Sequence, residues 1–220
     1  MTTAFVLLVL GALAALLFSV RALQVRRVVS SEMARKLVHV AMGFIGFPLP
    51  WFFANAGPVW LLAAAAVVAL AVVRFIPAAT CRLGAVLGGT GRVSLGEFYY
   101  PLGVAVAFTL AGGNRAAYCA AVGVLAFADT AGALVGKRWG SHRFKLRGGT
   151  KSCEGSGAVL ATSPVWVAAM LVFVGGASLN VALSRGLLVA AAAAAVEAVS
   201  SHGLDNLFLP IVVVELTRLG

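Results

Sequence analysis

Long apolar runs separated by short polar segments dominate the pattern of this chain. A helix needs about 20 apolar residues to cross roughly 30 Å of hydrocarbon, and irregular backbone cannot face lipid. The pattern therefore predicts transmembrane helices over residues 4–20, 37–55, 58–76, 98–112, 116–136, 157–176 and 186–200. A shorter run at 205–217 stays open as an eighth span, a half-span or a re-entrant piece, and Pro210 is expected to interrupt it.

The composition supports the same class of protein. Hydrophobic residues make up 61% of the 220 residues and charged residues 11%, whereas soluble domains run at about 25% charged. This excludes a soluble enzyme, a secreted module, a disordered chain and a coiled coil. We expect one integral membrane domain over 1–220 with an all-α fold, a polytopic transmembrane bundle of about seven spans (six to eight). The net charge of +10 then indicates loops beside anionic lipid, with no nucleic acid as partner.

The distribution of basic residues predicts an orientation. Fourteen of the 17 Lys and Arg residues lie in 21–36, 74–97 and 137–151, which alternate with the spans so that all three fall on one side. By the positive-inside rule these polar loops are cytoplasmic and the N-terminus lies outside. The site would face the cytoplasm, whether the membrane is that of a bacterial cell or of a eukaryotic organelle or the endoplasmic reticulum.

The acidic residues converge on that same side, with Glu215 as the exception. An acid inside a span costs about 2.5–3.5 kcal/mol and therefore needs a partner or a wet cavity. Asp129 falls inside the predicted span 116–136, so we expect it to face the bundle interior. The other five acids on this side lie at helix ends or in loops: Glu32, Glu97, Glu154, Glu197 and Asp205.

Carboxylates, cations and glycines at one interfacial level are the parts that phosphoryl transfer requires. Carboxylates hold Mg²⁺, Lys and Arg neutralise phosphate oxygens, and little covalent chemistry is needed from the protein. No P-loop is present, because the nearest match, Gly132 to Arg138, has one residue too few between its glycines and lacks Ser or Thr after Lys137.

At these positions the sequence resembles the polyprenol kinase family, which includes phytol kinase, dolichol kinase and the CTP-dependent diacylglycerol kinase. Phytol kinase is the most similar in size and in the C-terminal Asp-Asn-x-x-x-Pro. One departure is Ala128, where Gly is expected before the aspartate. The resemblance covers residues 32 to 210 and rests on these pieces: Arg35-Lys36-x-x-His39, Asp129 with Gly136 and Gly140, Lys151-Ser152-x-Glu154-Gly155-Ser156, and Glu197 followed by Asp205-Asn206 and Pro210.

The resemblance implies transfer of the γ-phosphate of CTP, with Mg²⁺ or Mn²⁺, to the hydroxyl of a membrane isoprenoid alcohol. Asp129 would hold the metal with Glu97 or Glu154, and Glu197 or Asp205 would be the base for the alcohol proton. Lys151 would stabilise charge on the transferring group. The expected nucleotide-binding residues are Arg35, Lys36, His39, Gly136, Lys137, Gly140, Lys151, Ser152, Gly155, Ser156 and Asn206.

Structural interpretations stand beside these. Arg35 and Lys36 also fit a topology signal, and Ser152 with Glu154 also fits helix capping. Tyr99 and Tyr100 are expected to be interface aromatics.

Two other functions stay open: a CTP-dependent cytidylyltransferase acting on a lipid phosphate, and a transporter of an anionic solute. The sequence leaves open which alcohol is used and whether the chain forms homo-oligomers.

Overall fold

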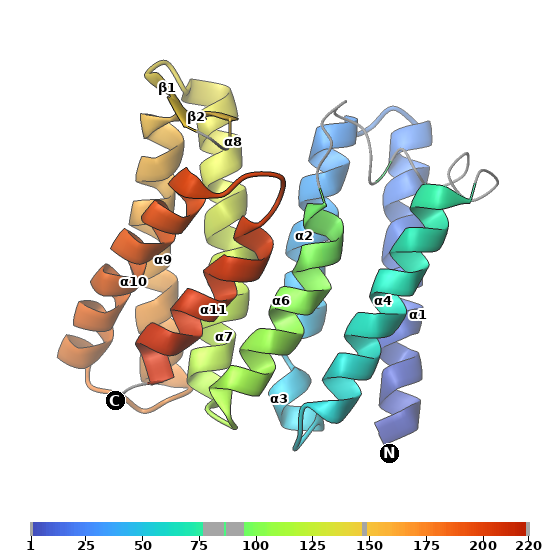
Figure 1. The fold of residues 1–220 in the computed structure, drawn as a ribbon, viewed down its shortest axis with the longest axis horizontal. Coiled ribbons are helices and arrows are strands. Elements are labelled where there is room, and N and C mark those ends of the chain that lie inside the picture. The colour runs from blue at the N-terminus through green and yellow to red at the C-terminus, as the bar shows by residue number, and fades with distance from the viewer. Residues whose placement is uncertain (1, 77–85, 87–94, 147–148, 219–220) are drawn as a thin grey trace.

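The computed structural model describes residues 2–76, 86, 95–146 and 149–218, and it is a bundle of roughly antiparallel helices (Figure 1). The prediction of an all-α fold is confirmed, with one small hairpin added. The elements are α1 (Thr2–Val25), α2 (Ser31–Gly46), α3 (Leu49–Phe52), α4 (Gly57–Phe75), α6 (Gly96–Ala111), α7 (Arg115–Gly123), the π-helical turn η1 (Val124–Ala128), α8 (Asp129–Trp139), β1 (Arg143–Leu146), β2 (Gly149–Ser152), α9 (Cys153–Phe173), α10 (Leu179–Val199) and α11 (Asp205–Arg218).

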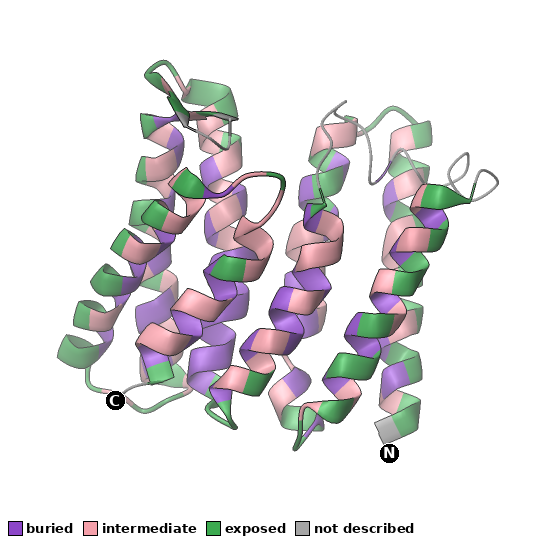
Figure 2. Cartoon of the chain, in the orientation of Figure 1, coloured by how far each residue is buried: buried purple, intermediate pink, exposed green. Residues whose placement is uncertain are grey.

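Large apolar side chains cover much of the outer surface of the bundle. Phe173, Phe75 and Val165 are exposed by 84%, 72% and 70%, and exposed positions recur along the outer helices (Figure 2). Five of the described helical segments are long and apolar enough to cross a membrane: Thr3–Val25, Gly57–Phe75, Arg115–Trp139, Cys153–Phe173 and Leu179–Val199. Such a surface suits lipid rather than water, and the number of spans and their sidedness stay predictions.

Several predicted helix boundaries are wrong by three or more residues, and two of the differences have a clear physical basis. The run 37–55 is two helices, because α2 ends at Gly46 and the short α3 begins after Pro48, whose ring lacks a backbone N–H. Residues 186–200 belong to a longer helix, since α10 begins at Leu179 and includes Arg185, whose guanidinium donates to the Leu216 carbonyl at 2.9 Å.

Contrary to prediction, Pro210 does not interrupt the last helix, and α11 continues through it. A proline cannot donate to the carbonyl four residues earlier, here that of Asn206. This carbonyl lies against α6 at Gly103, where a Cβ atom would sit only 2.2 Å from the Asn206 oxygen. The absence of a side chain at Gly103 therefore lets α6 pack closely against α11 at the point where Pro210 leaves the Asn206 carbonyl without its helical hydrogen bond.

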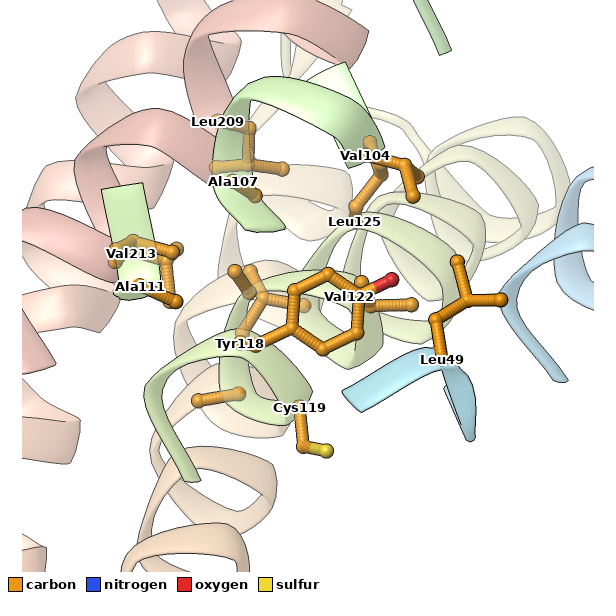
Figure 3. Close-up of a cluster of buried hydrophobic side chains, with 14 of the residues drawn as sticks. Leu49, Val104, Ala107, Ala111, Tyr118, Cys119, Val122, Leu125, Leu209 and Val213 are labelled. Carbon is orange, nitrogen blue, oxygen red and sulfur yellow. The ribbon is translucent and has the colours of Figure 1, made fainter. Parts of the chain in front are cut away.

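The core is centred on α7 and η1, which neighbouring helices surround. Tyr118, Val122 and Leu125 are almost fully buried, and they pack with side chains of α3, α6 and α11 (Figure 3). The Tyr118 hydroxyl donates to the Gly46 carbonyl at 2.9 Å, so the end of α2 is fixed to this core.

Candidate active site

Lys36, His39 and Asp129 form a buried group that we name the central cluster. The Lys36 Nζ donates to Asp129 Oδ2 at 3.0 Å, and His39 Nε2 lies 3.4 Å from the same oxygen. The Lys36 and Asp129 side chains are exposed by only 6% and 13%. Since positions 36 and 39 are three apart, they lie on one face of α2, and that face meets α8. The sequence-based expectation that Asp129 faces the interior fits this placement.

A π-helical turn immediately precedes Asp129. Its N–H donates to the carbonyl of Val124, five residues back, and α8 begins at the aspartate. The Leu125 carbonyl within this turn lies 2.8 Å from His39 Nε2 and accepts its hydrogen bond. Single π turns inside α-helices occur frequently at functional sites. This one joins α7 to α8 and fixes both Asp129 and the His39 ring.

Lys151, Ser156 and Glu197 form a second group, the hairpin cluster. The Lys151 Nζ donates to Glu197 Oε1 at 2.9 Å, and the Ser156 hydroxyl lies 3.4 Å from Glu197 Oε2. Lys151 is on β2, which pairs antiparallel with β1. The hairpin therefore places this ammonium over the end of α10.

Asp205 connects the two clusters. Its carboxylate interacts electrostatically with Asp129, Lys151 and Lys36, and the Lys151 charge also acts on Asp129. The next residue fixes the start of α11, because the Asn206 side-chain amide donates to the Gly96 carbonyl of α6 at 2.9 Å. Residues distant in the sequence thus share one electrostatic environment.

Two other predicted site residues form ion pairs outside the two clusters. Glu97 pairs with Arg74 and Lys137 with Glu32. The hydrogen bond from Lys137 holds the pKa of Glu32 below its ordinary value. The Lys36 charge also acts on Glu32, so the Lys137–Glu32 pair lies within electrostatic range of the central cluster.

Glu154 accepts from two side chains before the hairpin and from one backbone amide. The Ser141 hydroxyl donates to Glu154 Oε1 at 2.6 Å, and His142 contacts it through Nδ1 at 2.8 Å and through its backbone N–H at 3.1 Å. Glu97, Glu154 and Asp129 are therefore not brought together, and no three His, Cys, Asp or Glu residues gather as a metal-binding group within the described ranges. Arg35 is exposed beside the buried Lys36.

The predicted nucleotide-binding glycines lie in the seam between α8 and α9. A Cβ at Gly136 would meet Ser152 Oγ at 2.8 Å, one at Gly140 would meet Ser152 Cβ at 2.8 Å, and one at Gly155 would meet the Gly132 carbonyl at 2.8 Å. Ser152 caps α9 by accepting from the Gly155 N–H at 3.1 Å. Close packing explains these residue types, and their contact with a nucleotide stays a prediction.

Sequence reasoning missed Tyr100 and the role of His142. Tyr100 was expected at the membrane interface, but it is buried, with 3% exposure. Its ring meets that of His39 edge-on, with centroids 4.7 Å apart. No pattern in the sequence separates Tyr100 from Tyr99, since the distinction depends on which side of α6 faces α2.

The comparison with curated proteins gives one relative. Over 187 residues the chain is 32% identical to a phytol kinase of Synechocystis sp., and the match covers 82% of this chain and 76% of that protein. No family model matches the chain, and no solved structure is similar to it.

Proposed function

Because the chain belongs to the polyprenol kinase family, we propose that it transfers the γ-phosphate of CTP to the hydroxyl of a membrane isoprenoid alcohol. The alcohol would be of the phytol, geranylgeraniol or polyprenol type. The relative is a phytol kinase by name. The observation that carries the proposal is the presence of two lysine–carboxylate pairs, Lys36 with Asp129 and Lys151 with Glu197, near enough for the Lys151 charge to act on Asp129.

The two lysines are suited to hold a triphosphate. A lysine ammonium has three N–H donors, and within the described structure the hydrogen bonds of Lys36 and Lys151 go to one carboxylate each. Both therefore retain donors for phosphate oxygens. Two ammonium groups that converge from α2 and β2 stabilise the charge that spreads over the transferring group.

The chemistry of the acids fits a divalent metal. Asp129 and Asp205 are carboxylates near enough for the Asp129 charge to act on Asp205, and Mg²⁺ is commonly bound by one or two carboxylates together with substrate phosphates. These two would hold Mg²⁺ or Mn²⁺, which would neutralise charge on the phosphates. Glu97 and Glu154, predicted as metal ligands, are less suitable because they do not gather with Asp129 as a metal-binding group within the described ranges.

Asp205 is also the better candidate for orienting the alcohol proton. Glu197 already accepts from Lys151 and from Ser156. The described hydrogen bond of the Asp205 carboxylate goes to the adjacent Asn206 N–H at 3.2 Å, which leaves its second oxygen for a substrate hydroxyl. A base must lie within hydrogen-bond reach of the proton that it accepts.

The location follows from the same arrangement. Lys36, Lys151 and Asp205 lie near the starts of α2, α9 and α11, which Figure 1 places at the hairpin end of the bundle. The positive-inside rule assigns the basic loops at this end to the cytoplasm, where CTP is available. CTP and the alcohol would thus meet at the cytoplasmic membrane surface.

The deciding experiment uses purified protein in lipid nanodiscs with Mg²⁺ and CTP labelled on either the α or the γ phosphate. Phytol, geranylgeraniol, a long polyprenol and diacylglycerol are offered in turn, with ATP as the competing donor and Asp129→Asn as the control variant. We expect γ-label in the isoprenoid alcohols and none in that variant. Label from the α phosphate would instead mean cytidylyl transfer, and solute flux without a lipid product would mean a transporter.

A further inference from the structure

An apolar pocket lies between α1, α2, α4 and α6, and α1 and α4 lie across the bundle from the hairpin (Figure 1). Its lining includes Val9 and Leu13 of α1, Met42 of α2, and Ala63 and Ala66 of α4. From α6, Tyr100, Pro101 and Val104 complete the wall. None of the lining side chains is charged, and Tyr100 alone carries a hydroxyl.

The Tyr100 hydroxyl is the one group in this wall that calls for a partner. The side chain is buried, and its hydroxyl has no hydrogen-bond partner in the described structure. A buried donor without a partner costs about 1–3 kcal/mol, so such groups need an explanation. The hydroxyl lies beside Gly43 of α2, where a Cβ atom would come within 3.4 Å of it.

Tyr100 also connects the pocket to the central cluster. Its ring contacts the His39 ring, His39 Nε2 lies 3.4 Å from Asp129 Oδ2, and the Asp129 charge acts on the Tyr100 hydroxyl. One end of the pocket is therefore close to the reacting groups. From there the lining continues along α4 from Ala66 to Val59, about 10 Å at 1.5 Å per residue.

On the basis of the proposed function, we propose that this pocket binds the carbon chain of the acceptor alcohol next to its hydroxyl, with Tyr100 as the positioning residue for that hydroxyl. An aliphatic chain with a single hydroxyl at one end matches a wall that is apolar except at Tyr100. The volume is about 60 Å³, and a water-sized sphere needs ~10–15 Å³. The pocket thus holds only the first few carbons, and the remainder of the chain lies in lipid.

Photo-crosslinking tests the location without requiring catalysis. A geranylgeraniol analogue with a diazirine near its hydroxyl is irradiated with wild-type protein in nanodiscs, with and without excess phytol. We expect phytol-sensitive labels on α1, α2, α4 and α6 at the pocket residues. Labels confined to the outer faces of α9 and α10, or labels insensitive to phytol, would overturn the proposal. Because no nucleotide is needed, this result is separate from success or failure of the kinase assay.

Two variants of α4 provide a matched pair. Ala63 lines the pocket, whereas Ala64 is exposed on the outer surface. Ala63→Leu should raise KM for geranylgeraniol about tenfold and leave KM for CTP unchanged, while Ala64→Leu should change neither. Equal effects of the two substitutions would overturn the assignment.

Tyr100→Phe removes only the hydroxyl. We expect KM for the alcohol to rise about threefold to tenfold, the cost of one hydrogen bond, with an unchanged KM for CTP. A rise in the KM for CTP alone would place Tyr100 outside the alcohol site.

Discussion

The central and hairpin clusters both contain a lysine–carboxylate pair, but packed helices hold the first pair and a β-hairpin holds the second. Each pairs a lysine with a carboxylate at about 3 Å, but the Lys36 side chain is 6% exposed and the Lys151 side chain 22%. The central cluster joins α2 to the most buried part of the bundle, through the π turn before Asp129. The hairpin cluster depends on a two-stranded loop and on the ends of α9 and α10.

This difference indicates a division of labour. A site held by packed helices keeps its groups in a fixed geometry, which catalysis of phosphoryl transfer requires. A lysine on a hairpin can follow a nucleotide as it enters and leaves. The central cluster should therefore control turnover, and the hairpin cluster should control use of the nucleotide.

The largest expected effect is at Asp129. Asp129→Asn keeps the size of the side chain and one acceptor for Lys36 but removes the charge, and it should lower kcat by about 1,000-fold or more, as for loss of a key electrostatic group. The measurement is γ-label transfer at saturating CTP. Yield and elution of the variant in detergent should match wild type. Full activity would show that the aspartate is structural.

A double variant separates stability from catalysis in the same cluster. Removing one partner of a buried ion pair destabilises by about 3–5 kcal/mol, whereas replacing both by apolar residues is often neutral. Asp129→Leu alone should therefore unfold at a lower temperature than Asp129→Leu with Lys36→Met. We expect the double variant to regain thermal stability and no activity. Recovery of activity would contradict a catalytic role for both residues.

The placement of the central-cluster residues could largely be predicted from the sequence. The spacing of Lys36 and His39 and the cost of burying Asp129 restrict where these residues point, because a helix face and a lipid boundary leave few alternatives. The partners of Glu97 and Glu154 could not be predicted in this way. Arg74 and Ser141 reach them only through tertiary packing, and neither periodicity nor hydropathy records those contacts.

The same limit applies to the glycines and to the π turn. Gly136, Gly140 and Gly155 stand in the motif pattern of a nucleotide site, but the space that each requires is set by α8 and α9 together. The π turn adds one residue to a helix whose sequence, Val124 to Ala128, is ordinary for a span. The sequence thus predicts that these segments are helices and that Asp129 is buried, but it does not predict the close packing of the glycines or the π turn.

The hairpin cluster should show a smaller effect and a different kinetic signature. Lys151→Ala removes one ammonium from the triphosphate and leaves the central cluster intact, so KM for CTP should rise about 10- to 100-fold, as for loss of a charged hydrogen bond. Because Lys151 also stabilises charge on the transferring group, kcat should fall as well, but by less than for Asp129→Asn. Lys145→Ala on β1, whose side chain is exposed, is the control and should behave as wild type. A loss of yield without a change in KM would contradict the nucleotide role of Lys151.

The seam between α8 and α9 supports the hairpin cluster and offers a test of its packing. Gly136→Ala places a methyl group 2.8 Å from Ser152 Oγ, and such overpacking costs about 1–3 kcal/mol. We expect a lower unfolding temperature. KM for CTP should rise only a few-fold, because a shift of the Ser152 cap at the start of α9 would displace the adjacent Lys151 without removing it. Gly157→Ala on α9 meets nothing within 4 Å and should not destabilise. Equal stability of the two variants would show that the seam is not tightly packed.

The smallest effect is expected at Ser156, whose contact within the hairpin cluster is with Glu197 and not with Lys151. The Ser156 hydroxyl is 3.4 Å from Glu197 Oε2, long for a bond of this type, while Lys151 holds the other oxygen at 2.9 Å. Ser156→Ala should therefore raise KM for CTP no more than about threefold, below the value of an ordinary hydrogen bond. Titration of CTP in the γ-label assay measures this, with Lys151→Ala in parallel. A rise in KM for CTP as large as that of Lys151→Ala would mean that Ser156 itself contacts the nucleotide. The nucleotide site would then include the start of α9.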